Sequence, residues 1–181
     1  MKNLKRQLKS AGLVLIMTLT ITNVSLAQDA PKLSDAEVAM IAVVANQIDV
    51  SYAEIAKKKS RSAEVKKFAE TMFSDHNSVL GLAGDLAKKL GVTPKENAVS
   101  QSLLEGAEKT KKELNGLRGK KFDKFYIDNE VAYHEAVINA VENLLIPETE
   151  NQELKDLLMT AVPIFKAHLA HAKTVQQKVS R

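Results

Sequence analysis

Apolar side chains recur every three or four residues along most of this chain, and no stretch alternates apolar and polar residues as a half-buried strand does. One such pattern begins at "SDAE", which has the form of a capping box with Ser34 as the N-cap and Glu37 as its partner. A second runs from Ser62 to Gly91, with apolar positions spaced alternately by four and three residues. That spacing is typical of a helix packed along a bundle seam, and glycine commonly follows a helix end. Two long helices are therefore predicted.

The remaining apolar pattern predicts a connecting segment and two further long helices. Residues 92–119 carry only a narrow apolar stripe and are predicted to form a crossover helix on the outside of a bundle. The third long helix is predicted from Lys121 to Leu145, ending before Pro147, because proline lacks a backbone donor. The fourth begins near Asn151 and contains Pro163, where a kink is expected. The predicted fold is all-α, a ferritin-like four-helix bundle with an extra crossover helix.

The first 27 residues have the organisation of a secretory signal peptide. Four basic residues precede an apolar stretch at positions 11–26, and Ser25 and Ala27 occupy the small positions before a cleavage site. An uncleaved membrane anchor is the alternative, but the stretch is shorter than the roughly 20 apolar residues that span a bilayer. We predict a signal peptide at 1–27, a short linker at 28–33 and a helical bundle at 34–181. The protein is then exported, to the periplasm or to a site associated with the outer membrane.

The charge balance changes when the predicted signal peptide is removed. The whole chain has 26 basic and 22 acidic residues and a formal net charge of +4, and four of the basic residues precede position 10. The rest of the chain is therefore neutral, which excludes nucleic acid as a partner, because such binding needs a basic face. Membrane association is not excluded, but it gains little electrostatic support. The chain has no cysteine, so it forms neither a disulfide nor a thiolate metal site.

Three of the four histidines occupy apolar seam positions on three different predicted helices: His76, His134 and His168. This placement is unusual for a polar side chain, because seam positions face the interior of a bundle. His171 lies one position further round its helix and is expected to reach solvent. The three seam histidines are therefore candidates for a site inside the bundle.

Three segments, "FAETMFSDH", "FDKFYIDNEVAYHEAV" and "AVPIFKAHLAHA", resemble a family of secreted bacterial ferritin-like bundles known as domain-of-unknown-function family 4142. The resemblance extends from Leu33 to Val179. It implies a helical bundle in the cell envelope, and it implies no established reaction.

The resemblance also bears on the candidate site. It places His76, His134 and His168 on recurring histidine positions of the family, and Asp49 where the family usually has a glutamate. Asp49 is one methylene shorter, which weakens a ligand role. The chain also has Tyr133 where the family often has an acidic residue.

A ferritin-type di-iron centre is excluded by the residues that precede the histidines. Such centres use Glu-x-x-His pairs, because carboxylates bridge the two irons. The residues three positions before the seam histidines are Phe73, Val131 and Phe165.

Two interpretations of the histidines remain, a buried polar network and a metal site. A network would pair the rings with neighbouring polar groups, for which the candidates are Asp49, Asp75, Glu130, Tyr133 and Tyr52. A site rich in nitrogen and free of thiols would suit Zn²⁺, Cu²⁺ or Ni²⁺.

Helix rise gives a first estimate of which candidates share a level in the bundle. With turn centres at Ser60 and Glu148, the levels of Asp49 and His76 differ by roughly 7 Å, and those of His134 and His168 by roughly 9 Å. This estimate argues against one four-ligand site. It favours a looser chain of candidate ligands: Asp49, His76, Glu130, His134 and His168.

The functional prediction is a non-catalytic binding or structural module that takes a small ligand or an envelope partner. The alternative is a periplasmic metal-binding protein that uses the histidines, and a third hypothesis is a redox enzyme with a metal site unlike that of ferritin. A nucleophilic hydrolase is not predicted, because the chain has neither a thiol nor a Gly-x-Ser-x-Gly elbow. We therefore predict that the protein is not an enzyme.

Overall fold

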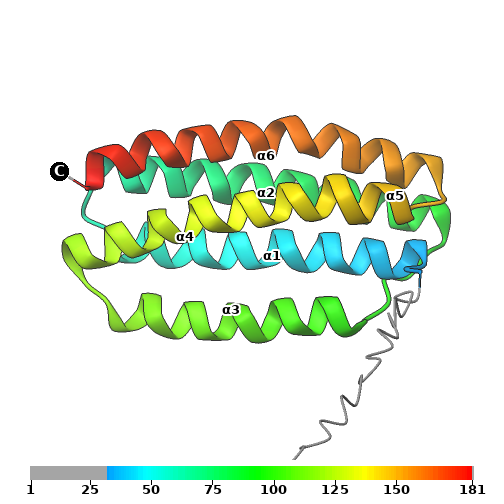
Figure 1. Cartoon of the computed structure of the whole chain (residues 1–181), viewed down its shortest axis with the longest axis horizontal. Helices are drawn as coiled ribbons and strands as arrows, with labels where there is room; N and C mark the ends of the chain where they lie inside the picture. Colours follow the sequence, from blue (N-terminus) through cyan, green and yellow to red (C-terminus); the bar gives the residue numbers. More distant parts are fainter. Residues whose placement is uncertain (1–31, 181) are drawn as a thin grey trace, which may run out of the picture. The chain divides into compact units, whose positions relative to one another are not determined.

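Helices make up almost all of residues 32–180, the part of the chain that the computed structural model describes (Figure 1). The described part contains no strand, which confirms the predicted all-α fold. The predicted signal peptide and most of the predicted linker lie outside the described residues. The elements are α1 (Asp35–Lys59), α2 (Ala63–Leu90), α3 (Ala98–Gly116), α4 (Gly119–Ala140), a π-helical segment (Val141–Leu145), α5 (Ile146–Glu148) and α6 (Gln152–Val179).

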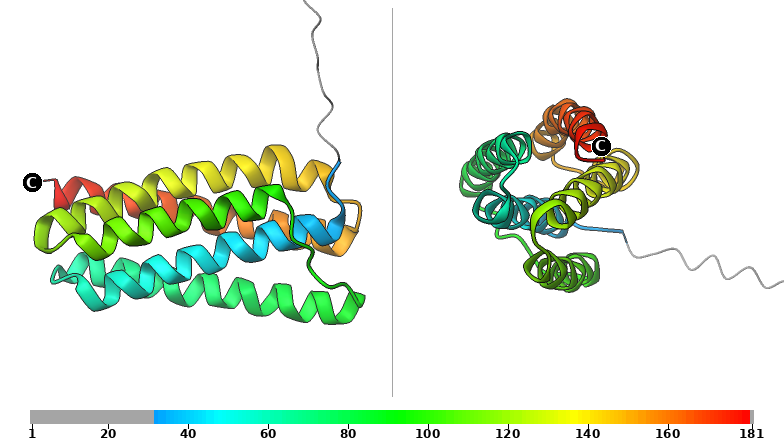
Figure 2. Two further views of the ribbon diagram at one scale, coloured as in Figure 1. Left: turned by 90° about the horizontal axis from the view of Figure 1, so that it is seen from below. Right: turned by 90° about the vertical axis from the view of Figure 1, so that its left-hand side faces the viewer.

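The four long helices α1, α2, α4 and α6 lie side by side and form a bundle (Figures 1 and 2). A short turn joins α1 to α2, and another joins α5 to α6, so that the closest pairs are the α1–α2 hairpin and the α4–α6 hairpin. Helix α3 connects the two hairpins and packs against the outside of α1. The structure thus confirms a four-helix bundle with a crossover helix.

The starts of three helices follow the predicted signals. Ser34 and Glu37 form the predicted capping box, Ser62 caps α2, and Asn151 caps α6 by accepting a bond from the amide of Leu154. The capping side chains satisfy backbone donors that have no partner within the helix. These ends could be read from sequence because each depends on residues three or four positions apart.

Gly91 ends α2 with a left-handed backbone (φ 64°), whereas Gly84 lies inside the helix. A side chain at Gly91 clashes with its own backbone, so we expect Gly91→Ala to lower the free energy of unfolding by about 1 kcal/mol. Gly84→Ala should raise it by up to about 1 kcal/mol, because alanine favours helix and nothing lies within 4 Å of the added Cβ. Urea denaturation measures both, and equal effects from the two substitutions would contradict this interpretation.

The predicted end of the third long helix, before Pro147, is wrong. The helix continues through the π-helical segment Val141–Leu145 and α5 to Glu148. In the π-helical segment the amide of Ile146 donates to the carbonyl of Val141, five residues back. This wider turn accommodates Pro147, whose ring would meet the carbonyl four residues earlier in a regular helix. Helix α6 likewise continues through Pro163 without interruption.

The apolar core consists of two clusters. One lies around Phe68, Phe122 and Tyr126, and the other around Leu158 and Phe165. Helix α1 is long and apolar enough to cross a membrane by length and composition, but 44% of its most apolar window is buried in the bundle. A single helix of this kind is weak evidence for a membrane span, because a helix in the core of a bundle passes the same test.

Candidate metal centre

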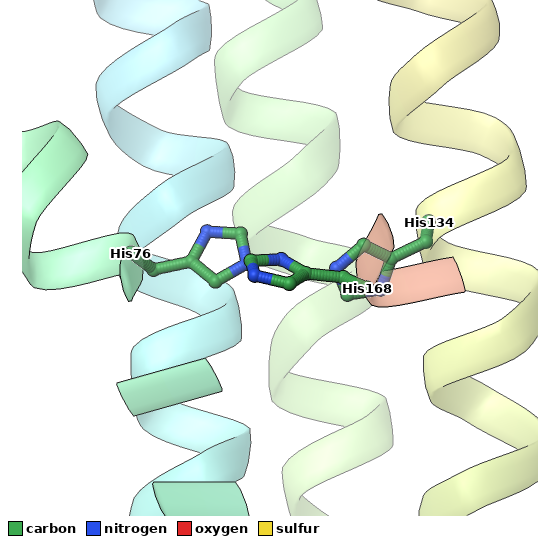
Figure 3. Close-up of side chains that lie close together, drawn as sticks. All are labelled: His76, His134 and His168. Atoms are coloured by element: carbon green, nitrogen blue, oxygen red, sulfur yellow. The ribbon is translucent and has the colours of Figure 1, made fainter. Parts of the chain in front are cut away.

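The three seam histidines meet inside the bundle (Figure 3). His76 comes from α2, His134 from α4 and His168 from α6, and each residue is at most 4% exposed. Their ring centroids are 5.2–5.6 Å apart. One nitrogen of each ring lies within 4.8 Å of one nitrogen of the other two. The structure thus brings together side chains from three helices that are far apart in sequence.

The orientation of His76 is set by an asparagine on α1. The Asn46 amide nitrogen donates to the carbonyl of Ala42 (2.8 Å), so its amide oxygen faces His76 and lies 2.7 Å from Nδ1. Because that oxygen only accepts, Nδ1 of His76 carries the proton. The lone pair is on Nε2, which has no hydrogen-bond partner.

The other two histidines are held in the same way. Nδ1 of His134 donates to the carbonyl of Glu130 (2.9 Å), and Nε2 of His168 donates to the carboxylate of Asp75 (2.9 Å). The remaining nitrogen of each ring, Nε2 of His134 and Nδ1 of His168, is buried without a partner. Each ring is therefore fixed in one tautomer with its lone pair free, as in metal-binding histidines.

Burial keeps all three rings neutral. It lowers the pKa of His76 to about 2 and that of His134 to about 4. Burial also lowers the pKa of His168, although the Asp75 carboxylate acts in the opposite direction. Neutral imidazole is the form that binds a metal ion, so these ligands need not lose a proton at neutral pH.

Two carboxyl groups lie beside the histidines and form, together with His134, a second group of candidate ligands. Asp49 on α1 and Glu130 on α4 are fully buried, and their four side-chain oxygens have no hydrogen-bond partner other than the neighbouring carboxyl group. Oδ2 of Asp49 lies 3.4 Å from Nε2 of His76 and 3.6 Å from Nε2 of His134. Oε2 of Glu130 lies 3.6 Å from Nδ1 of His134. Burial raises the pKa of Asp49 to about 8 and raises the pKa of Glu130 well above its usual range.

The donor set fits a borderline divalent ion. Ligand bonds of 2.0–2.1 Å in a tetrahedral site separate neighbouring ligand atoms by about 3.3 Å, close to the distances from Asp49 to His76 and His134. Three imidazoles and one carboxylate suit Cu²⁺, Zn²⁺ or Ni²⁺ better than Mg²⁺ or Ca²⁺. Because the raised pKa of Asp49 leaves it largely protonated at neutral pH, a cation that it binds would displace its proton. The nitrogens that metal ligation would use, Nε2 of His76, Nε2 of His134 and Nδ1 of His168, are therefore among the buried atoms without a partner.

A match to the family described as "Domain of unknown function (DUF4142)" covers residues 22–175, which include the whole histidine cluster. The chain belongs to the DUF4142 family. The resemblance drawn from the three sequence segments is confirmed.

The fold of this DUF4142 protein is similar to that of a solved structure described as "CopM in the Cu(II)-bound form". The TM-score is 0.60 and the sequence identity 18%, over 81% of this chain and 98% of that chain. The similarity therefore concerns the arrangement of the helices. Comparison with curated proteins gives no match.

The predicted level difference between the histidines of this DUF4142 chain is wrong. Because α5 extends to Glu148 and α6 starts at Gln152, the centre of the turn is Glu150. His134 lies 16 residues before that point and His168 lies 18 residues after it, so their levels differ by only about 3 Å. Helix geometry therefore allows His134 and His168 to share one site.

Other sequence predictions have mixed outcomes in the DUF4142 structure. Asp75 is a partner of His168, as suggested, but the hydroxyl of Tyr133 donates to the carbonyl of Ala45 (2.8 Å). His171 is half-buried, with its ring 5.1 Å from that of Phe68, outside the cluster. Asn46 was missed. The only sign of its role in the sequence is that it is polar and lies three positions before Asp49, on the same face of the predicted helix.

Proposed function

We propose that this DUF4142 protein is an exported, non-catalytic metal-binding protein that holds one divalent ion inside its bundle. The observation that carries the proposal is the meeting of three neutral histidines, each with one nitrogen fixed by a partner and the other buried without one. The Cu(II)-bound form of CopM, which has a similar fold, supports a copper ion.

Four side chains would hold the ion: His76 and His134 through Nε2, His168 through Nδ1, and Asp49 through a carboxylate oxygen. Cu²⁺ is the expected first choice, because a given nitrogen-rich site binds it more tightly than Zn²⁺ or Ni²⁺. Asn46, Asp75 and the carbonyl of Glu130 would keep the ligand rings in place.

Holding an ion is favoured over chemistry because the cavity that His76 and His134 line offers little room for a substrate, and none of the proposed ligands lines the larger apolar cavity nearby. The cavity beside His76 and His134 has a volume of about 10 Å³, hardly enough for one water molecule. Ala45, Val137 and Phe165 help to close it. A reaction at the ion would need space for a reactant next to it.

A purely structural polar network is the second candidate, and it explains the hydrogen bond that each ring makes. It does not explain why Nε2 of His76, Nε2 of His134 and Nδ1 of His168 are buried without partners, because each unsatisfied group costs about 1–3 kcal/mol. A network kept for stability alone would pair them.

The proposal is tested on protein isolated after expression of the full chain and stripped of metal. We expect one Cu²⁺ per chain, weaker Zn²⁺ and Ni²⁺ binding, and a higher melting temperature with each bound ion. Calorimetric titration and elemental analysis measure these quantities. Failure of all three ions to bind stoichiometrically would overturn the proposal. N-terminal sequencing of the same protein tests export, and Gln28 is the expected first residue.

A further inference from the structure

A second and much larger cavity lies next to the histidine cluster. Its volume is about 330 Å³, and α1, α2, α3, α4 and α6 all contribute to its wall. Asn46, Tyr133 and Phe165 belong both to this wall and to that of the small cavity at the histidines. Most of the lining side chains are aliphatic, among them Val43, Ala83, Leu86, Leu103, Ala140 and Leu158.

The polar side chains of the wall are already engaged within the chain. Both oxygens of Asp35 accept backbone amides, those of Glu150 and Asn151, and Tyr133 donates to Ala45. Asn46 is bonded to Ala42 and His76. A buried water needs two to four polar partners, so the cavity does not favour water. An empty apolar cavity of this size is strongly destabilising, so an apolar occupant is favoured.

The dimensions of the cavity restrict the shape of that occupant. Its lining on α2 extends from Val79 to Leu90 and on α1 from Asp35 to Asn46, each about 16 Å along the helix. A volume of about 330 Å³ over that length corresponds to a mean cross-section of about 20 Å², the width of one polymethylene chain. At about 1.2 Å per bond of an extended chain, 16 Å accommodates roughly 12 to 14 carbons.

The charge of the wall restricts the head group. The described residues that line the cavity include no lysine or arginine, so a carboxylate or phosphate finds no counter-ion inside. Among the large apolar side chains of the lining, Val99 (38%) and Leu144 (36%) are the most exposed, near the start of α3 and the end of α4. These residues mark the mouth, and because they are only about one-third exposed a head group there is partly desolvated, which costs a hydroxyl less than a charged carboxylate.

We propose that this cavity is a binding site for a single aliphatic chain of about 12 to 14 carbons with an uncharged head group. The chain lies along the bundle between the two hairpins, with its head at Val99 and Leu144 and its end against Phe165. This site does not depend on the proposed metal centre. The uncharged head distinguishes the ligand from a free fatty acid.

The test uses protein isolated after expression of the full chain, with the neutral fluorophore N-phenyl-1-naphthylamine as probe and straight-chain alcohols from octanol to octadecanol as competitors. Each added methylene should tighten binding about threefold to fourfold until the cavity is filled, and chains beyond about 14 carbons should gain nothing. Dodecanoate at neutral pH should compete at least tenfold more weakly than dodecanol. Absence of displacement, or affinity that rises steadily to octadecanol, would overturn the proposal.

Variants locate the binding. Ala140→Phe and Ala83→Phe fill the cavity from α4 and α2 and should weaken dodecanol binding at least tenfold. Ala132→Phe places the same side chain on an exposed position of α4, outside the lining, and should leave the affinity unchanged. Circular dichroism checks that each variant is folded. Two cavity-filling variants are used so that the test can still be made if one of them does not fold. His76→Ala should still bind dodecanol, which separates this result from failure of the metal proposal. Equal affinities in all variants would place the alcohol elsewhere and refute the site.

Discussion

His76→Ala is expected to weaken Cu²⁺ binding by at least about 100-fold. The substitution removes one of three imidazoles and leaves Oδ2 of Asp49 without the nitrogen that lies 3.4 Å away. Loss of a group that merely orients a ligand typically costs 10–100-fold in metal affinity, so loss of the ligand itself costs more. Competition against a chelator of known affinity measures the change.

His171→Ala is the matched control. His171 lies on α6 three residues after His168, and its ring packs against Phe68 outside the cluster. Its removal should change the Cu²⁺ affinity by less than threefold. If His76→Ala behaves like the control while its circular dichroism spectrum is native, the ion is bound elsewhere.

Asp49→Asn is expected to stabilise the metal-free protein at pH 7.5 by more than 1 kcal/mol. Burial raises the pKa of Asp49 to about 8 from an ordinary value of 3.8. Between pH 3.8 and about pH 8 the folded state therefore binds more protons than the unfolded state. The free energy of unfolding therefore falls as the pH rises through that window, by up to about 1.4 kcal/mol per pH unit. Asparagine has no such charge, so the gain should be large at pH 7.5 and small near pH 4.

Urea denaturation at the two pH values measures this difference. Because the pKa values of the histidines are lowered in the folded state, the free energy of unfolding decreases as the pH falls. This decrease occurs in both proteins and therefore cancels when the variant is compared with its parent. Glu54→Gln changes an exposed acid on the same helix and should have little effect at either pH. A variant less stable than the parent at pH 7.5, or a gain that increases toward pH 4, would contradict the account. With Cu²⁺ present the sign should reverse, because Asp49 is a proposed ligand.

The fold could be predicted because its signals are local. The capping box at Ser34 and the stop at Gly91 each involve residues within one or two helical turns, and the seam pattern places His76, His134 and His168 inside the bundle. Periodicity of this kind depends only on the geometry of a single helix.

The register between helices could not be predicted in the same way. The π-helical segment before Pro147 lets the helix continue, and this moves the turn centre by two residues. A shift of the turn centre by one residue changes the level of a residue by about 1.5 Å on each of the two helices, in opposite directions. An error of two residues in the turn centre therefore gave a predicted level difference of roughly 9 Å between His134 and His168 instead of about 3 Å. Asn46 was missed for a related reason, since an asparagine on a helix has no evident role until its partner on another helix is known.

The two hairpins each supply half of the centre. Asp49 and His76 belong to the α1–α2 hairpin, and His134 and His168 belong to the α4–α6 hairpin. An ion bound by all four side chains therefore fastens one half of the molecule to the other. Release of the ion would then need no competing chelator, because a partner that separates the two hairpins removes two of the four ligands at once.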